Sequence, residues 1–224
     1  MSLIEEGTVP LSKAEIMAAK RRVFASQEMR EKREALANKA WNKSKISLEE
    51  EFHGFYQAMH KNPKKFLGYS TKRHVKNITK LVEKHNAKTL LDYGCGKGMQ
   101  YLGRRFHEQW GGVLPHCYDP GVRGLHKKPD GTFDGVICCD VLEHIPESLI
   151  SDVLEEISLY AEKFVFANIA LSPARKTLPN GQNAHVTLQP ESWWRMKFEK
   201  SMSDQDVLLV FSDEDERDGR SEDE

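Results

Sequence analysis

Residues 89–98 have the composition of a ligand-binding loop in an α/β protein. The stretch reads Thr-Leu-Leu-Asp-Tyr-Gly-Cys-Gly-Lys-Gly, so a short apolar run ends at Asp92 and glycines follow at alternate positions, namely Gly94, Gly96 and Gly98. Glycine allows tight turns and close approach of the backbone to a ligand because it has no Cβ. The pattern therefore predicts a strand followed by a cofactor-binding loop.

Two common phosphate-binding loops do not match this spacing. A dinucleotide fingerprint needs Gly-x-Gly-x-x-Gly, and Met99 occupies the position of its third glycine. A P-loop needs Gly-Lys followed by Ser or Thr, whereas Lys97 is followed by Gly98. Both loops are therefore disfavoured, and what remains is an acidic-x-Gly-x-Gly-x-Gly motif after a strand.

This motif resembles the first motif of the class I S-adenosylmethionine-dependent methyltransferases. Their cofactor carries no phosphate, so its loop needs close backbone approach more than an anion hole. The resemblance implies that Asp92 holds the ammonium group of S-adenosylmethionine, directly or through water, and that Gly94, Cys95, Gly96 and Gly98 form the cofactor loop. The alternative is a glycine-rich turn in an unrelated α/β protein.

Two further motifs follow in the order that this family shows. The strand-like run 113–118 leads into Asp119-Pro120, and a carboxylate at this distance from the glycine loop can accept hydrogen bonds from ribose hydroxyls. Taken alone, this dipeptide with Gly121 would be an ordinary turn. Residues 132–147 contain Phe-Asp-Gly-Val and Asp-Val-Leu-Glu-His, which look like the fourth strand of the family and its following loop. The resemblance covers about residues 66–200, and it assigns to the cofactor site Asp119, Pro120, Asp140, Val141 and Leu142.

The spacing also predicts a departure from the family. Only thirteen residues separate Asp119 from Phe133, whereas a helix, a strand and two loops need about thirty. We therefore expect an α/β fold, a Rossmann-like class I methyltransferase sheet with a reduced third-strand region, preceded by an α-helical N-terminal extension. The adenine contact that normally follows the third strand is in doubt, and residues 127–131 are the expected substitute. Helices are expected at 12–42, 47–60, 71–85, 146–160 and 190–200, and later strands at 163–170 and 207–211.

Charge is distributed unevenly along the chain. Residues 1–85 have an excess of eight basic residues and residues 204–224 an excess of eight acidic residues, although the net charge is −1. We predict a basic helical extension over 1–65, a methyltransferase domain over 66–211 and an acidic disordered tail over 212–224. The basic charge is explained either as solvated helix surface or as a contact with nucleic acid.

Composition predicts a cytoplasmic protein without a membrane partner. Hydrophobic residues make up 39% of the 224 residues, and no apolar run approaches the length of a membrane span. The four cysteines include none in a metal-binding Cys-x-x-Cys pair, so we expect them to be reduced and to pack as small hydrophobic side chains.

Residues expected at the carboxyl ends of the strands could activate a methyl acceptor. Glu143 and His144 follow the fourth strand of the resemblance, and His185 lies in the long loop after the next strand. In ubiquinone-pathway O-methyltransferases and small-RNA 2′-O-methyltransferases, a similar acidic-x-x-Glu-His binds a divalent metal. The resemblance thus implies a site for a divalent metal ion such as Mg²⁺, with the ligands Asp140, Glu143, His144 and His185. The other interpretations are His144 or His185 as a base without metal, and structural roles for these residues.

The acceptor itself is not specified by any motif. The expected function is S-adenosylmethionine-dependent transfer of a methyl group to an oxygen or nitrogen of a small molecule. One alternative is a methyltransferase acting on nucleic acid or protein docked by the basic N-terminal helices. Another is a non-catalytic cofactor-binding or assembly protein.

Overall fold

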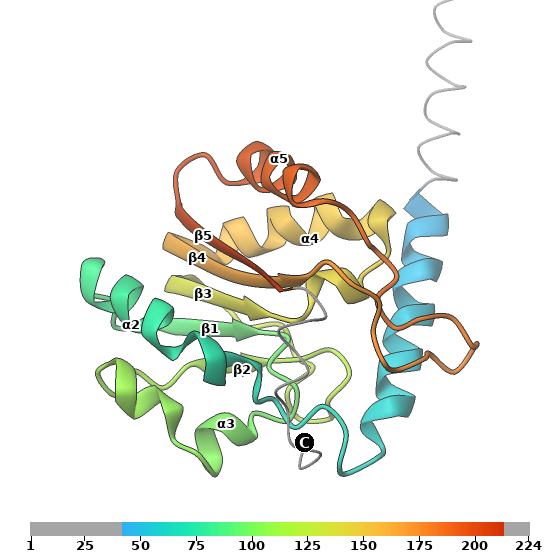
Figure 1. Ribbon diagram of the computed structural model, residues 1–224, viewed down its shortest axis with the longest axis horizontal. Coiled ribbons are helices and arrows are strands. Elements are labelled where there is room, and N and C mark those ends of the chain that lie inside the picture. The colour runs from blue at the N-terminus through green and yellow to red at the C-terminus, as the bar shows by residue number, and fades with distance from the viewer. Residues whose placement is uncertain (1–41, 213–224) are drawn as a thin grey trace, which may run out of the picture. The chain divides into compact units, whose positions relative to one another are not determined.

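The computed structural model describes residues 42–212 (Figure 1). The expected helix before residue 42 and nearly all of the predicted acidic tail lie outside these residues. The chain divides into two compact units, Met1–Ser47 and Leu48–Glu224. Residues 42–60 are helical, and the part in the second unit is called helix 48–60. Between residues 42 and 212 no helix combines the length and apolar character that a bilayer span requires.

A five-stranded parallel sheet forms the centre of the second unit. Its strand order is β2-β1-β3-β4-β5, so the chain moves to one side of β1 and then returns to the other. The strands are β1 Leu90–Tyr93, β2 His116–Tyr118, β3 Phe133–Cys139, β4 Ala161–Ala170 and β5 Asp206–Ser212. The α/β class predicted from the sequence is confirmed. The order reverses between β1 and β3, and open α/β sheets bind ligands beyond the carboxyl ends of strands at such a point.

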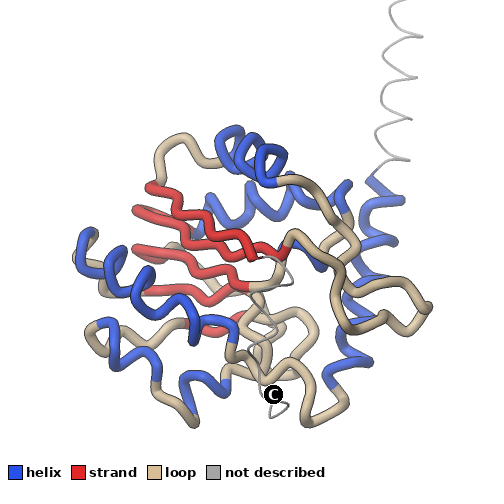
Figure 2. Tube along the Cα trace, in the orientation of Figure 1, coloured by secondary structure: helices blue, strands red, loops and turns tan. Residues whose placement is uncertain are grey.

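Helices cover both faces of the sheet (Figure 2). One face carries α4 (Glu147–Tyr160) and α5 (Glu191–Ser201), and the other carries α2 (Val75–Lys84), preceded by the 3-10 helix Ser70–His74. The short helices α3 (Met99–Leu102), Phe106–Trp110 and Leu142–His144 complete the elements. Successive residues of β3 join different cores, with Cys138 beside α4 and α5 and Ile137 beside α2. This alternation is what a strand buried on both faces requires.

Residues 119–132 contain neither helix nor strand, as the short spacing predicted. As a result β2 is an edge strand of the sheet. The strand expected at 113–118 is shorter, because Pro115 lacks the amide hydrogen that the ladder would need there.

Helix 48–60 belongs to the unit that contains the sheet. Its residues Phe52, Phe55, Tyr56 and Met59 recur at helical spacing and pack on the loop after β4, against Leu178 and Ala184 among others. Figure 1 shows this helix (blue) and that loop (orange) beside each other at the carboxyl edge of the strands. Both segments therefore lie at the edge of the sheet where its strands end.

Candidate active site

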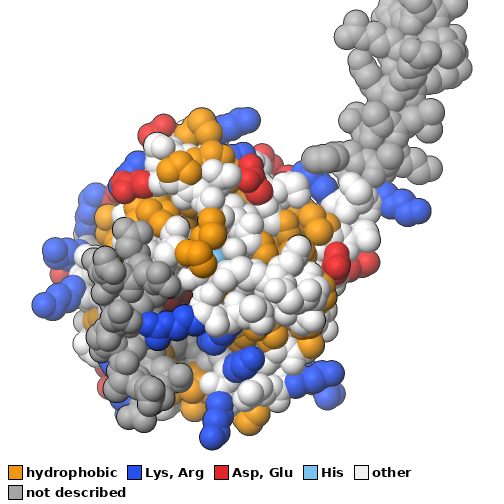
Figure 3. Space-filling model, turned by 45° about the vertical axis from the view of Figure 1, so that its right-hand side comes forward, with side chains coloured by type: hydrophobic (Ala, Val, Ile, Leu, Met, Phe, Trp, Pro, Cys, Tyr) orange, Lys and Arg blue, Asp and Glu red, His pale blue; other side chains and the backbone are white. Residues whose placement is uncertain are grey.

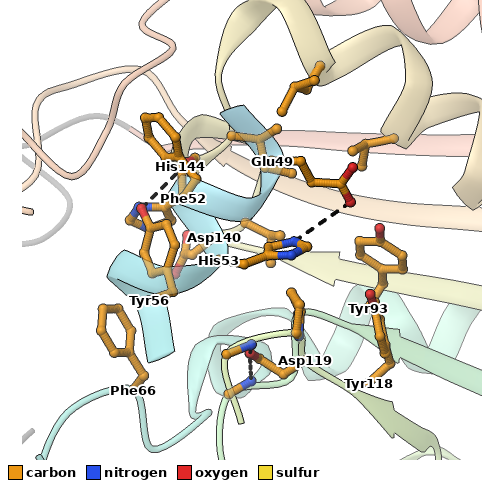
Figure 4. Close-up of a pocket in the computed structure, with 18 of the residues that line it drawn as sticks. Glu49, Phe52, His53, Tyr56, Phe66, Tyr93, Tyr118, Asp119, Asp140 and His144 are labelled. Carbon is orange, nitrogen blue, oxygen red and sulfur yellow. Dashed lines mark hydrogen bonds and ion pairs between the residues drawn. The ribbon is translucent and has the colours of Figure 1, made fainter. Parts of the chain in front are cut away.

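A cavity of about 360 Å³ lies at the carboxyl edge of the sheet. Gly94 and Gly96 line it after β1, Asp119 after β2, and Asp140 and Val141 after β3. Helix 48–60 forms the opposite wall, and Figure 4 shows its side chains across the cavity from those of the strand ends. In the space-filling view a hollow opens on this side of the molecule, with Lys and Arg side chains along its lower rim (Figure 3).

The glycine loop is shaped by contacts within the chain. Gly94 and Gly96 have φ values of 81° and 59°, in the left-handed region. A Cβ on Gly94 would lie 2.3 Å from a methyl carbon of Val141, and a Cβ on Gly96 would lie 2.7 Å from the carbonyl oxygen of Phe66. That carbonyl also accepts the N–H of Lys97 at 3.0 Å. The segment before α2 therefore closes one side of the loop. Because Gly94 and Gly96 have no side chains, Val141 and the carbonyl of Phe66 can pack directly against the loop.

Asp119 is a nearly buried carboxylate at the cavity wall. It is 8% exposed, and its two oxygens accept the backbone N–H groups of Gly96 at 2.8 Å and Gly121 at 2.9 Å. Burial raises the pKa of Asp119 to about 6, partly offset by these two hydrogen bonds. The carboxylate is thus held in one orientation and retains lone pairs for a ligand. Pro120, the next residue and a predicted cofactor contact, also lines the cavity.

Four predicted cofactor residues do not line the cavity. Cys95, Gly98 and Leu142 are buried behind it. Asp92 is 2% exposed, and its Oδ2 accepts hydrogen bonds from Gln100 Nε2 at 2.8 Å and Tyr101 Oη at 2.7 Å. Burial raises the pKa of Asp92 to about 7. Asp92 therefore joins β1 to α3, and it does not line the cavity where it was expected to hold a cofactor ammonium.

Asp140 sits at the end of β3 with φ of 54°, an uncommon backbone conformation for a non-glycine residue. Its Oδ1 accepts a hydrogen bond from Asn168 Nδ2, and its Oδ2 lies 3.4 Å from Arg73 Nη2. These two partners hold the carboxylate at the cavity wall.

Glu143, His144 and His185 come together, although the two histidines are 41 positions apart in the sequence. One oxygen or nitrogen from each lies within 4.8 Å of the others, and the two imidazole centroids are 4.7 Å apart. Glu143 is fully buried, and its Oε1 accepts the N–H of Ala170 at 2.9 Å. His185 thus lies beside the loop after β3, but neither His185 nor Glu143 lines the cavity that His185 was expected to reach. Asp140 is not part of this group.

Backbone carbonyls fix the tautomers of both histidines. Nδ1 of His144 lies 2.8 Å from the carbonyl oxygen of Ala184, and Nδ1 of His185 lies 2.6 Å from that of Ser172. A carbonyl oxygen can only accept, so each Nδ1 carries a hydrogen, and in the neutral imidazole Nε2 carries the lone pair. Burial, with His185 as a neighbour, lowers the pKa of His144 to about 4. His144 is therefore neutral at physiological pH.

Tyr56 connects helix 48–60 to this group. Its hydroxyl lies 3.1 Å from Nδ1 of His144 and donates to the carbonyl oxygen of Ala184 at 3.2 Å (Figure 4). Neither Tyr56 nor His60, which also lines the cavity, was predicted as a site residue. The apolar stripe of helix 48–60 indicated a buried face, but nothing in the sequence indicated that this face lies beside His144.

Two further side chains that follow β4 in the sequence make contacts within the protein. Trp194 belongs to α5 and is fully buried in the core that α4 and α5 form with the sheet. Lys176 Nζ lies 4.7 Å from the ring centre of Phe66, a residue that lines the cavity.

Comparison with models of protein families, with curated proteins and with solved structures finds no match for this chain.

Proposed function

We propose that the chain is an S-adenosylmethionine-dependent methyltransferase that methylates a hydroxyl or amine of a small molecule. The observation that carries this proposal is the buried carboxylate of Asp119, oriented by the amides of Gly96 and Gly121 at the wall of the cavity. The cavity lies where the strand order reverses, which is where open α/β sheets bind nucleotide cofactors. Its volume is within the range of small-molecule sites.

The residues around the cavity fit this cofactor. Asp119 would accept hydrogen bonds from the ribose, and the backbone at Gly94 and Gly96 would contact the amino-acid end, as the resemblance implies. When bound, S-adenosylmethionine supplies a methyl group on a positively charged sulfur. The acidic side chains that line the cavity favour such a cation, and they are Glu49, Asp119, Asp140, Asp152 and Glu156.

The acidic side chains of the cavity wall also indicate which charge the acceptor carries. Lys128 is the one Lys or Arg among the residues that line the cavity in the described part of the chain. An anionic acceptor would meet the acidic wall, so a neutral or cationic acceptor is favoured. Helix 48–60 closes one side, which favours a small molecule over a folded macromolecule. The chain must hold this acceptor close to the methyl carbon and take the proton that leaves its hydroxyl or amine.

Glu143, His144 and His185 fit a divalent ion better than a base without metal. Metal-binding histidines usually donate their second ring N–H to a carbonyl or carboxylate, and both histidines do so here. A histidine with a pKa of about 4 is a weak base at neutral pH but remains a ligand. Two imidazoles and one carboxylate suit a first-row transition ion better than Mg²⁺. When bound, such an ion lowers the pKa of a coordinated hydroxyl.

Calorimetric titration with S-adenosylhomocysteine tests the cofactor. The native chain should bind it, and Asp119→Asn should bind it at least about tenfold more weakly because a hydrogen bond to a charged acceptor is lost. Asp204→Asn is the matched control, since Asp204 is exposed, outside the cavity lining and outside residues 127–131. Absence of binding by the native chain would contradict the proposal.

Thermal unfolding with and without Mn²⁺ tests the ion separately from turnover. The native melting temperature should rise with Mn²⁺ and return with a chelator. Glu143→Gln should abolish the rise, whereas Glu155→Gln, a change at an exposed position, should retain it. An equal rise in both variants would exclude this metal site.

A macromolecular acceptor, nucleic acid or protein, is the second candidate. Basic side chains lie at the edge of the cavity, since Arg73 contacts Asp140 and Lys176 lies over Phe66. If the acceptor is a polyanion, its binding should weaken steeply with salt. Activity on a small molecule that does not respond to salt would favour the first candidate. Cofactor binding without transfer to any acceptor would favour the non-catalytic alternative.

A further inference from the structure

We infer that one end of the cavity binds the ammonium group of the methyl acceptor. This tyrosine end consists of four residues that line the cavity, namely Tyr93, Tyr118, Glu49 and Glu156. His144 lies on the opposite side of the cavity, as Figure 4 shows. The inference rests on the proposed function and deepens it, because it assigns the acceptor to one chemical class, the small-molecule amines.

Tyr93 and Tyr118 supply two buried hydroxyl groups at this end. They are the last residues of β1 and β2 and are paired in the register of the sheet, so their ring centroids lie 5.1 Å apart. The two residues are 6% and 3% exposed, and Figure 4 shows both hydroxyls directed toward the side of Glu49. Neither hydroxyl has a hydrogen-bond partner within residues 42–212. Buried hydroxyls usually have a partner, so these two groups are open to a ligand.

A carboxylate from α4 lies beside the two rings. Glu156 Oε2 accepts a hydrogen bond from Lys128 Nζ at 2.8 Å, whereas its buried Oε1 has no hydrogen-bond partner in the described part of the chain. Burial, followed by the charge of Glu156, raises the pKa of both phenols, so both hydroxyls keep their protons at neutral pH. A ligand that contacts Oε1 must donate a hydrogen, because an ionised carboxylate can only accept.

The charges around the tyrosine end favour a cation. Lys128 brings one positive charge, and this charge is paired with Glu156. Two more acidic residues line the cavity nearby, because Asp152 lies one helical turn before Glu156 on α4 and Glu49 lies beside the tyrosines in Figure 4. The described residues thus place three carboxylates and one ammonium around this part of the cavity, which leaves an excess of negative charge.

A primary ammonium group matches these partners. It has three N–H donors for the carboxylate of Glu156 and the hydroxyl oxygens of the two tyrosines, and tyrosine rings attract cations. An alcohol would bring one hydrogen and no charge. The sulfonium of the cofactor has a charge but no hydrogen to donate, so it would leave these acceptors unused.

The ammonium group serves to recognise the acceptor and is not the group that is methylated. A site that stabilises the protonated amine keeps its proton in place, and methyl transfer to that nitrogen would need the lone pair that the proton occupies. The methyl group therefore goes to another oxygen or nitrogen of the same molecule.

Calorimetric titration with benzylamine and benzyl alcohol as probes tests this inference. The two probes have similar shapes and differ in the ammonium group. The native chain should bind benzylamine at least about tenfold more tightly than benzyl alcohol, because hydrogen bonds between charged groups are lost in the alcohol. Saturating benzylamine should leave the affinity for S-adenosylhomocysteine unchanged, because the two ligands occupy different parts of the cavity.

Two variants separate recognition from a structural role of Glu156. Glu156→Gln should abolish the preference for benzylamine, whereas Lys128→Gln should strengthen benzylamine binding because a competing cation is removed. Both variants break the same ion pair, so a structural role would change benzylamine binding in the same direction in both. Glu155→Gln, a change at the preceding and exposed position of α4, should behave as the native chain.

The outcomes separate this inference from the proposed function. If the native chain binds no S-adenosylhomocysteine, the proposed function fails. If it binds S-adenosylhomocysteine but does not prefer benzylamine to benzyl alcohol, the ammonium site fails while the proposed function stands. Competition between benzylamine and S-adenosylhomocysteine would assign the tyrosine end to the cofactor and overturn the inference. These native measurements need no variant, so they decide even where Glu156→Gln does not fold.

Discussion

Replacing Gly96 with alanine should damage the glycine loop more than the same change at Gly98. Both residues have similar left-handed backbones, with φ of 59° and 64°. A Cβ at Gly96 would lie 2.7 Å from the carbonyl oxygen of Phe66 and 3.1 Å from Cα of Gly68, whereas a Cβ at Gly98 meets only Cys117 Sγ at 3.4 Å. The pair therefore separates the cost of the backbone conformation from the cost of the contact.

The expected magnitudes follow from these distances. A left-handed alanine costs roughly 1–2 kcal/mol at either position. Overpacking against neighbouring atoms adds about 1–3 kcal/mol at Gly96, because backbone atoms cannot rotate away. Gly96→Ala should thus lower the free energy of unfolding by about 2–5 kcal/mol and Gly98→Ala by about 1–2 kcal/mol.

Urea unfolding of both variants and the native chain measures these differences in stability. Titration with S-adenosylhomocysteine measures how each change in the loop affects ligand affinity. A displaced Phe66 would move the chain that closes the loop, so Gly96→Ala should also bind the ligand more weakly than Gly98→Ala. Equal losses of stability and affinity in the two variants would refute the packing of the segment before α2 on the glycine loop.

Three further predictions concern the core and the cavity wall. The pKa of Asp92 is raised from 3.8 to about 7, so the folded chain keeps this carboxyl protonated at pH values where the unfolded chain has released the proton. The stability that this proton gives the fold is lost as the pH rises through 7. The free energy of unfolding of Asp92→Asn, measured relative to the native chain by urea titration, should therefore be about 2–3 kcal/mol higher at pH 8 than at pH 5. A difference that does not change with pH would contradict the assignment. Tyr56→Phe should cost about 0.5–1.5 kcal/mol in the same assay through loss of its bond to Ala184, and no loss would mean that the hydroxyl does not support the helix. Gly135→Ala places a Cβ 2.2 Å from the ring of Phe164, so its melting temperature should fall strongly, and a native value would contradict this contact.

The sheet and the ends of its strands were predictable because their signals are local. An apolar run followed by glycines indicates β1 and its loop. The short spacing after Asp119 indicates that no helix and strand fit between β2 and the strand that begins at Phe133. The meeting of His144 and His185 was also predictable, since both follow the carboxyl ends of neighbouring parallel strands.

The contribution of helix 48–60 was not predictable in the same way. Its apolar face had the spacing of a buried helix, but the sequence does not state which surface covers that face. Tyr56 reaches Ala184, which is 128 positions away, and His60 reaches Asp119 through tertiary packing alone. Gly96 was expected to approach a ligand, but its sequence context did not indicate that its missing side chain also admits the carbonyl of Phe66.

The most direct test of the central claim is transfer of a labelled methyl group from S-adenosylmethionine into a cell extract separated into small-molecule, protein and nucleic-acid fractions. The proposed function predicts label in the small-molecule fraction, and loss of that label in Asp119→Asn. Label confined to protein or nucleic acid would contradict the small-molecule acceptor. No label in any fraction would contradict methyl transfer itself.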